Sequence, residues 1–286
     1  MTREEFIELA GTGVVLLDGA TGSNLRRAGM PVGVSPERWI LDHPQVLLDL
    51  QRAYVDAGSQ IIYAPTFGCN RISLTNYGLQ DQRAELTGRL VRLSKEAAGS
   101  RALVAGDIMS TGKMLEPAGD MTYSQLYDVY REEITALAEA GVDLLVAETL
   151  MGVEETAAAL DAAQSVCDLA VLCSLSVEAD GSAVEAVATL QEMGAAAVGV
   201  NCSVGPDQLE AVVSGMKAVA VVPVMAKPNA GLPVMTETGE ALYNMGPEAF
   251  ARHMRQLVKA GAGVIGGCCG TTPEYIRQVR ESLYCR

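Results

Sequence analysis

The sequence predicts a single α/β domain, residues 1–286, folded as a (β/α)8 TIM barrel, and three observations support this fold class. The chain has 286 residues, which is enough for one large α/β domain of the barrel type. Short apolar runs alternate with segments whose apolar residues recur at helical spacing. Eight such runs can be counted, and we find no low-complexity linker that would divide the chain.

Four of the eight apolar runs share a signature in which a helix ends at glycine and a strand follows. They read DAGSQIIYAPTF, EAGVDLLVAETL, EMGAAAVGVNCS and KAGAGVIGGCCG. Glycine in the left-handed conformation closes a helix, and a run rich in Val, Ile and Ala fits a strand buried on both faces. The other four candidate strands lie in GVVLLDG, ALVAGDI, AVLCSLS and AVVPVMAKP.

The segments between the runs predict helices with one apolar and one charged face. Examples are PQVLLDLQRAYVDAG, YSQLYDVYREEITALAEAG and GPEAFARHMRQLVKAG. Strands that alternate with helices form right-handed βαβ units and a parallel sheet. A doubly wound open sheet is the alternative, but it usually has a G-x-G-x-x-G fingerprint after the first strand, and DGATGSNL does not match. We expect the Pro- and Gly-rich stretch PVMAKPNAGLPVMTETG to be only a loop.

Composition and charge argue against several classes of function. A formal net charge of −14 and a sequence pI of about 4.6 oppose binding to nucleic acid or to anionic membranes. The first residues, MTREEFIELAGTG, are acidic where a secretion signal needs an apolar core, and no stretch offers about 18 consecutive apolar residues. We therefore expect a cytoplasmic protein, in which seven cysteines are not a disulfide framework.

In a barrel of this kind, the residues that end the strands share one mouth, where barrel enzymes place their chemistry. In strand order, the expected positions are Asp18, Thr66 and Phe67, Asp107, Glu148, Ser176, Asn201 and Cys202, Pro228 and Asn229, and Cys268 and Cys269. The sixth and eighth strands lie two apart around the barrel, so the three cysteines of this rim can converge on one point.

The convergence of Cys202, Cys268 and Cys269 predicts a catalytic zinc site. Zn²⁺ prefers four ligands, so three thiolates leave one position open. A thiol substrate fits there, because zinc favours the thiolate over a free thiol with a pKa of about 8.5. A nucleophilic-cysteine enzyme is the alternative, but it needs a histidine base, and both His43 and His253 are expected on the surface. The remaining cysteines are expected in packing or surface positions: Cys69, Cys167, Cys173 and Cys285.

Asp18 and Glu148 are candidates to bind an ammonium group. An acid at a strand end is often only a turn former or a helix N-cap. Two carboxylates across the barrel from a thiol site could instead hold the ammonium of an amino-acid thiol. The carboxylate of such a substrate would meet backbone N–H groups of the DGATGS turn.

Several strings resemble the homocysteine S-methyltransferase family, in particular the homocysteine-binding module of cobalamin-dependent methionine synthase. They are LLDGATGSNL, PTFGCNR, AETL, GVNCSVGP, KPNAGLP and GGCCGTTPEYI, and the resemblance runs from about residue 12 to the end. It implies a (β/α)8 barrel whose Cys202, Cys268 and Cys269 bind the zinc that activates homocysteine. It also implies that Asp18 and Glu148 hold the amino group of homocysteine. The amino-acid pocket would be lined by Gly19, Ala20, Thr21 and Asn229.

The resemblance implies a methyltransferase of methionine biosynthesis that methylates homocysteine or a related thiol. The sequence shows no folate or cobalamin module, so we expect an external donor. The donor would be S-methylmethionine, a betaine, or methylcobalamin on a separate corrinoid protein. The alternative is a non-catalytic zinc- or thiol-binding barrel that serves the corrinoid protein.

Two loops at the expected mouth depart from the family pattern. GDIMSTG stands after the third strand, where relatives often read Gly-Asp-x-Gly-Pro. EADGSAVEAVATLQEMG, after the fifth strand, is shorter than the family pattern. These loops are therefore the first place to look if the acceptor is a thiol other than homocysteine.

Overall fold

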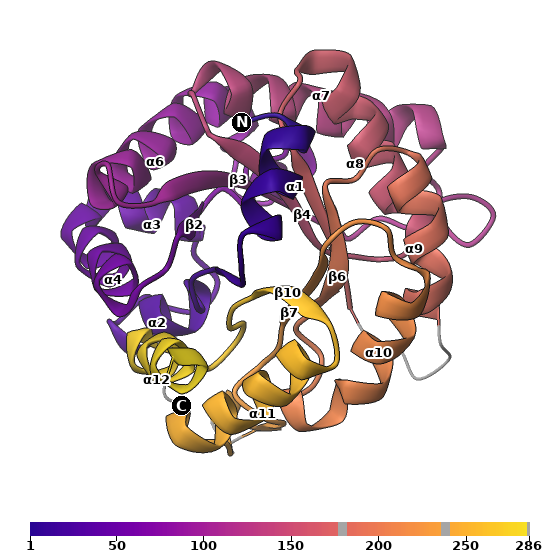
Figure 1. Cartoon of the computed structure of the whole chain (residues 1–286). Coiled ribbons are helices and arrows are strands. Elements are labelled where there is room, and N and C mark those ends of the chain that lie inside the picture. Colours follow the sequence, from indigo (N-terminus) through magenta and orange to yellow (C-terminus); the bar gives the residue numbers. More distant parts are fainter. Residues whose placement is uncertain (177–181, 236–240, 285–286) are drawn as a thin grey trace.

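The computed structural model describes residues 1–176, 182–235 and 241–284, and its main sheet is the predicted barrel. Eight parallel strands follow the order β1-β10-β7-β6-β5-β4-β3-β2, and an isolated parallel bridge between Leu17 and Ile61 joins its two edges (Figure 1). Their bounds are β1 Val15–Leu16, β2 Ile61–Ala64, β3 Leu103–Met109, β4 Leu144–Leu150, β5 Val171–Leu175, β6 Ala197–Asn201, β7 Val224–Lys227 and β10 Ala262–Ile265. All eight strand predictions are confirmed, and the doubly wound alternative is wrong.

Helices surround the barrel, and at least one follows each of its strands (Figure 1). They are α2 Gly22–Arg27, α3 Pro36–Asp42, α4 Pro44–Ala57, α5 Arg71–Thr75, α6 Arg83–Ala98, α7 Tyr123–Glu139, α8 Val153–Val166, α9 Ser182–Glu192, α10 Glu210–Val219, α11 Pro247–Lys259 and α12 Pro273–Tyr284, with short 3₁₀ turns at Gln80–Gln82 and Pro206–Gln208. A large apolar cluster between strands and helices holds the two layers together. No helix in the described residues is long and apolar enough to cross a membrane.

The glycine signature behaves as predicted. The four glycines that precede β2, β4, β6 and β10 all have positive φ, with 110° at Gly58, 82° at Gly141, 99° at Gly194 and 115° at Gly261. This left-handed conformation lets the chain turn sharply from a helix into a buried strand.

Two glycine-to-alanine substitutions are expected to have opposite effects on stability. Gly141 has a φ of 82° with no atom near an added Cβ, so Gly141→Ala should lower the free energy of unfolding by about 1–2 kcal/mol through backbone strain alone. Gly88 lies inside α6, also with space for a Cβ, and Gly88→Ala should raise the free energy of unfolding by about 0.5–1 kcal/mol. Urea unfolding of both variants measures the difference, and equal effects would contradict this account.

The N-terminal helix α1 (Arg3–Gly11) lies across one end of the barrel (Figure 1). Its Phe6 is fully buried in the apolar cluster of the barrel interior. The Met1 amino group donates to the Asp143 carbonyl, and Arg3 donates to the Ala195 carbonyl at 3.2 Å. Both carbonyls precede strands, so α1 covers the end at which the strands begin. The opposite end, where the strands finish, holds the cavity described below.

The loop between β7 and α11 contains a small antiparallel hairpin, so the prediction of only a loop is wrong. β8 (Pro233–Met235) pairs with β9 (Ala241–Tyr243), with Val234 opposite Leu242. A pair of apolar side chains on neighbouring strands stabilises such a ribbon. The stretch taken as a loop ends before β9, which is why its pairing partner was missed. The residues between the two strands, 236–240, lie outside the described part.

Candidate active site

A cavity of about 250 Å³ opens where the barrel strands end. Its lining combines residues predicted at the mouth with several that were not: Gly19, Ala20, Thr21, Gly22, Ser23, Tyr63, Phe67, Asp107, Met109, Glu148, Thr149, Cys202, Lys227, Cys268 and Cys269. The three cysteines lie in this lining together with two acidic residues and one lysine.

The polar groups at the base of the cavity continue the inward-facing side of the strands. Side chains alternate along a strand, so residues two positions apart share one face. The interior apolar cluster contains Ala105, Val146, Leu172 and Met225. Two positions further along the same strands are Asp107, Glu148, Ser174 and Lys227. The cavity therefore has a polar base directly above an apolar core.

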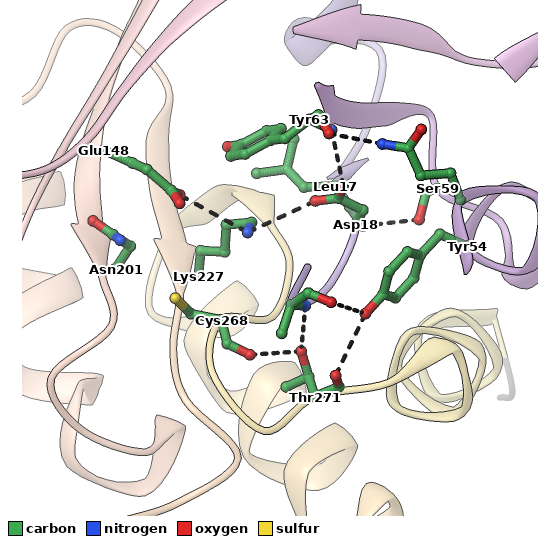
Figure 2. A network of polar contacts seen from close by, with 12 residues as sticks. Leu17, Asp18, Tyr54, Ser59, Tyr63, Glu148, Asn201, Lys227, Cys268 and Thr271 are labelled. Carbon is green, nitrogen blue, oxygen red and sulfur yellow. Dashed lines mark hydrogen bonds and ion pairs between the residues drawn. The ribbon is translucent and has the colours of Figure 1, made fainter. Parts of the chain in front are cut away.

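Lys227 lies between the two carboxylates that were predicted to bind ammonium (Figure 2). Its Nζ is 3.7 Å from Asp18 Oδ1 and 3.8 Å from Glu148 Oε2, and it lies 4.5 Å from the centre of the Tyr63 ring. Asp18 Oδ2 also accepts the Tyr63 N–H at 2.8 Å. Both ion-pair distances are longer than a hydrogen bond, and among the described residues Asp18 Oδ1 and Glu148 Oε2 have no hydrogen-bond partner.

Burial has the largest effect on the pKa values of the carboxyl groups around Lys227. It raises the pKa of Asp18 to about 7 and that of Glu148 to about 7, while the positive charge of Lys227 acts in the opposite direction on both. Burial alone would lower the pKa of Lys227, but Glu148 and Asp18 outweigh it and raise that pKa. Asp107 lies nearby with its Oδ1 unpartnered among the described residues, and burial followed by the charge of Glu148 raises its pKa. Near neutral pH, the protonation of these carboxyl groups is therefore sensitive to any charge that is brought next to them.

The three cysteine sulfurs have a spacing that suits a tetrahedral metal. All three Sγ atoms lie within 4.8 Å of one another, and those of Cys202 and Cys269 are 4.0 Å apart. Tetrahedral Zn²⁺ with bonds of about 2.3 Å places its sulfur ligands about 3.8 Å apart. Hydrogen bonds from Cys268 and Cys269 lower the pKa of Cys202 to about 3, and their bonds to Cys202 raise the pKa values of Cys268 and Cys269. The donor set therefore fits zinc.

Backbone contacts fix the two cysteine segments against β7. The N–H of Cys202 donates to the Lys227 carbonyl at 3.1 Å, and the N–H of Cys268 donates to the Pro228 carbonyl at 2.7 Å. Cys202 and the residue after it have left-handed φ angles of 57° and 62°. Gly270 has a φ of 83°, and a Cβ there would lie 2.4 Å from the Tyr243 ring of the hairpin. Glycine is therefore required where the hairpin covers the cysteine loop.

A family model described as homocysteine S-methyltransferase matches residues 15–283. The chain belongs to the homocysteine S-methyltransferase family. It is 28% identical to the methionine synthases of Mycobacterium leprae and Mycobacterium tuberculosis, over 98% of this chain but only 25% of each relative. It thus spans a quarter of the length of these curated relatives. The metallated form of the homocysteine methyltransferase MmuM from Escherichia coli has the same fold, with a TM-score of 0.80, 23% identity, and 96% of this chain and 97% of that chain covered.

The four residues that the family resemblance assigned to the amino-acid pocket do not all lie together. Gly19, Ala20 and Thr21 line the cavity. Asn229 instead lies beside the cysteines, where its side chain hydrogen-bonds Cys202. The Ala20 N–H donates to the Thr271 hydroxyl at 3.0 Å. The backbone N–H groups at the start of α2 therefore remain the closest match to the predicted carboxylate site.

Other predicted mouth residues have supporting positions or lie elsewhere. Thr66 is fully buried and exchanges hydrogen bonds with the Asp107 backbone, at 2.9 and 3.0 Å. Ser176 is half-buried and does not line the cavity. His43 is exposed and stacks on Trp39, and His253 contacts Gln256, so neither histidine lies at the cysteines.

The remaining cysteines and the two unusual loops have the following places. Cys69 and Cys173 are buried and Cys167 is half-buried, whereas Cys285 lies outside the described residues. Met109, the last residue of β3, lines the cavity, and Ser110 in the loop that follows donates to Glu155 at 3.0 Å. The unusual segment after β5 begins in residues 177–181, which lie outside the described residues.

Sequence reasoning missed Lys227 and Tyr243. It searched the position after each strand, and Lys227 is the last residue of β7. The available signal was the two-residue alternation, because Lys227 follows the apolar Met225 at the spacing of one strand face. Tyr243 comes from the hairpin and forms a hydrogen bond with Cys269. Its position depends on a pairing that the local sequence pattern did not indicate.

Proposed function

We propose that this protein is a zinc-dependent S-methyltransferase that converts homocysteine to methionine with an external methyl donor. The observation that carries the proposal is one cavity lined both by three convergent cysteine sulfurs and by the buried carboxyl groups of Glu148 and Asp107, each with one oxygen that has no hydrogen-bond partner among the described residues. An amino-acid thiol is the substrate class that matches both ends. Membership of the homocysteine S-methyltransferase family supports homocysteine as the acceptor.

Cys202, Cys268 and Cys269 are the residues that would hold the metal. When bound there, Zn²⁺ would supply a position at which a substrate thiol is favoured as the thiolate. The three cysteine thiolates carry one more negative charge than the ion neutralises, which keeps a neighbouring sulfur electron-rich. A nucleophile of this kind suits attack on an electrophilic carbon.

Asp18 and Glu148 would bind the substrate ammonium, with Lys227 as their resident counter-ion. These three side chains are 1, 7 and 3% exposed, so water screens their charges little. Asp107 adds a third carboxyl group beside Lys227, and a second ammonium group there would favour the ionised form of that carboxyl group. The substrate carboxylate would be bound by backbone N–H groups of the DGATGS turn at the start of α2, other than the Ala20 N–H, which donates to Thr271.

Methyl transfer then requires orientation rather than acid–base chemistry on the carbon. The substrate sulfur attacks the methyl carbon in line, a sulfur–carbon bond forms, and the electron pair of the breaking bond leaves with the donor. The thiol proton is released to solvent when the substrate binds as thiolate. The cavity opens at the mouth, where S-methylmethionine, a betaine or the methylcobalamin of a separate corrinoid protein would present its methyl group. The similarity to methionine synthases favours the corrinoid donor.

The experiment that tests the proposal combines metal content, binding and turnover. Elemental analysis of protein purified without chelator should give one zinc per chain. Calorimetric titration should show binding of homocysteine but not of methionine, which has no free thiol. Methionine formation with S-methylmethionine, glycine betaine and methylcobalamin then identifies the donor. Absence of homocysteine binding by zinc-loaded protein would overturn the proposal, and binding without turnover on any donor would favour the non-catalytic alternative.

A further inference from the structure

The wall of the cavity contains a strained residue, Thr149, directly after Glu148. Its φ is 56°, in the left-handed region that β-branched residues rarely adopt. The register between β4 and β5 shifts here, because Glu148 pairs with Ser174 while Leu150 pairs with Leu175. Thr149 is thus an extra residue in β4. Bulges of this type occur beside active sites, where they re-aim a side chain.

Asn201, at the end of β6, makes the contacts that hold this bulge. The Thr149 N–H donates to Asn201 Oδ1 at 3.0 Å, and Asn201 Nδ2 donates to Thr149 Oγ1 at 2.5 Å. The Ser174 hydroxyl on β5 also donates to Asn201 Oδ1, at 2.9 Å. Asn201 is fully buried, and Figure 2 shows it next to Glu148. The Asn201 amide therefore reaches from β6 across β5 to β4. Strands β6 and β4 are not neighbours in the sheet and share no backbone pairing.

The position of Asn201 in the chain gives this contact a functional meaning. The next residue is Cys202, which belongs to the thiol end of the cavity, while the residue before Thr149 is Glu148, which belongs to the ammonium end. Asn201 is thus adjacent in sequence to Cys202 and is hydrogen-bonded to Thr149, the residue that follows Glu148. An amino-acid thiol must span these two ends with a fixed number of methylene groups.

We propose that Asn201 is a positioning residue that sets the placement of Glu148 relative to Cys202, and so the fit of the substrate ammonium when the thiol is bound. This inference rests on the proposed function, because it assumes an amino-acid thiol. Loss of the amide would leave the half-buried Thr149 N–H without its side-chain acceptor and release the bulge. Glu148 would then move, whereas the three cysteines would keep their own backbone contacts to Lys227, Pro228 and Ala230.

The test compares two ligands that differ only in the amino group, homocysteine and 4-mercaptobutyrate, by calorimetry on zinc-loaded protein. Asn201→Ala should retain one zinc per chain and weaken homocysteine binding about tenfold to a hundredfold. Its affinity for 4-mercaptobutyrate should stay within about twofold of wild type. Equal weakening of both ligands, or loss of zinc, would overturn the inference, since Asn201 would then serve the thiol end or general stability.

Substitutions at Thr149 provide an independent test if Asn201→Ala folds poorly. Thr149→Val removes only the Oγ1 acceptor and should reduce discrimination between the two ligands, whereas Thr149→Ser keeps the hydroxyl and should retain it. The double variant Asn201→Ala/Thr149→Val should bind homocysteine no more weakly than the weaker single variant, because both act on one contact. Additive losses would refute the inference. A wild-type protein that does not bind homocysteine would overturn the proposed function as well, whereas normal wild-type binding with unchanged variants would overturn this inference alone.

Discussion

Cys269→Ala is expected to remove zinc and methyl transfer while leaving the barrel folded. The substitution takes away one of three sulfurs that lie within 4.8 Å of one another, so two thiolates remain to hold the metal. Metal affinity should fall by several orders of magnitude, because each thiolate contributes a large share of the binding free energy. The barrel should persist, because its apolar interior cluster does not include Cys269.

Two controls make this measurement decisive. Cys167→Ala removes a half-buried cysteine at the end of α8, away from the cavity, and should keep one zinc per chain. Bound zinc stabilises the folded state by mass action, so the thermal stability of Cys269→Ala should match that of chelator-treated wild type rather than of the loaded enzyme. A Cys269→Ala protein that still carried one zinc per chain would refute the assignment of the metal ligands.

Lys227→Met is expected to destabilise the protein by about 3–5 kcal/mol at pH 8, the usual cost of removing one partner from a buried ion pair. Lys227 is the only cation that the described residues place between Asp18 and Glu148, and all three side chains are buried. Without it, those carboxylates must remain protonated or pay for a buried charge. Lys217→Met, at an exposed position on α10, is the matched control and should change the free energy of unfolding by less than about 0.5 kcal/mol.

The effect of Lys227→Met should depend on pH with a definite sign. The folded-state pKa values of Asp18 and Glu148 are about 7, above the ordinary values of 3.8 and 4.5. Carboxyl groups that bind protons more tightly when folded stabilise the protein fully at acid pH, and this stability is lost as the pH rises through 7. Removal of Lys227 raises both pKa values further. The difference between variant and wild type should therefore be small near pH 4 and largest near pH 8.

Denaturant unfolding of wild type, Lys227→Met and Lys217→Met at a series of pH values measures this dependence. Zinc loading must be matched across the proteins, because the cysteines lie in the same cavity. A Lys227→Met penalty that was constant from pH 4 to pH 8 would show that the lysine acts through packing rather than through its charge.

The barrel and the convergence of Cys202, Cys268 and Cys269 could be predicted from sequence because both depend on local patterns. The glycines at 58, 141, 194 and 261 each end a helix shortly before a buried strand. Cys268 and Cys269 come shortly after the last of these strands. Lys227 was missed although its spacing from Met225 was visible, because only positions after the strands were searched. The strain at Thr149 was not predictable in the same way, since a bulge depends on how β4 is registered against β5.

The hairpin was missed for a related reason. The pairing of Val234 with Leu242 joins residues on either side of a Gly- and Thr-containing segment, and neither strand is long enough to show a clear alternation. Tyr243, whose side chain forms a hydrogen bond with Cys269, belongs to that pairing. Site residues that come soon after a strand in the sequence could thus be predicted. Residues whose position depends on pairing with another strand could not.

The helix α1 has a consequence for the order of events in turnover. Because α1 and Phe6 close one end of the barrel, the proposed acceptor and the methyl donor would share the mouth at the other end. Glu148, one of the two proposed ammonium-binding carboxylates, lines the base of the cavity, so a donor seated over the cysteines would block the path of an arriving amino acid. Catalysis would then be compulsory-ordered, with homocysteine entering before the donor and methionine leaving only after the demethylated donor has departed.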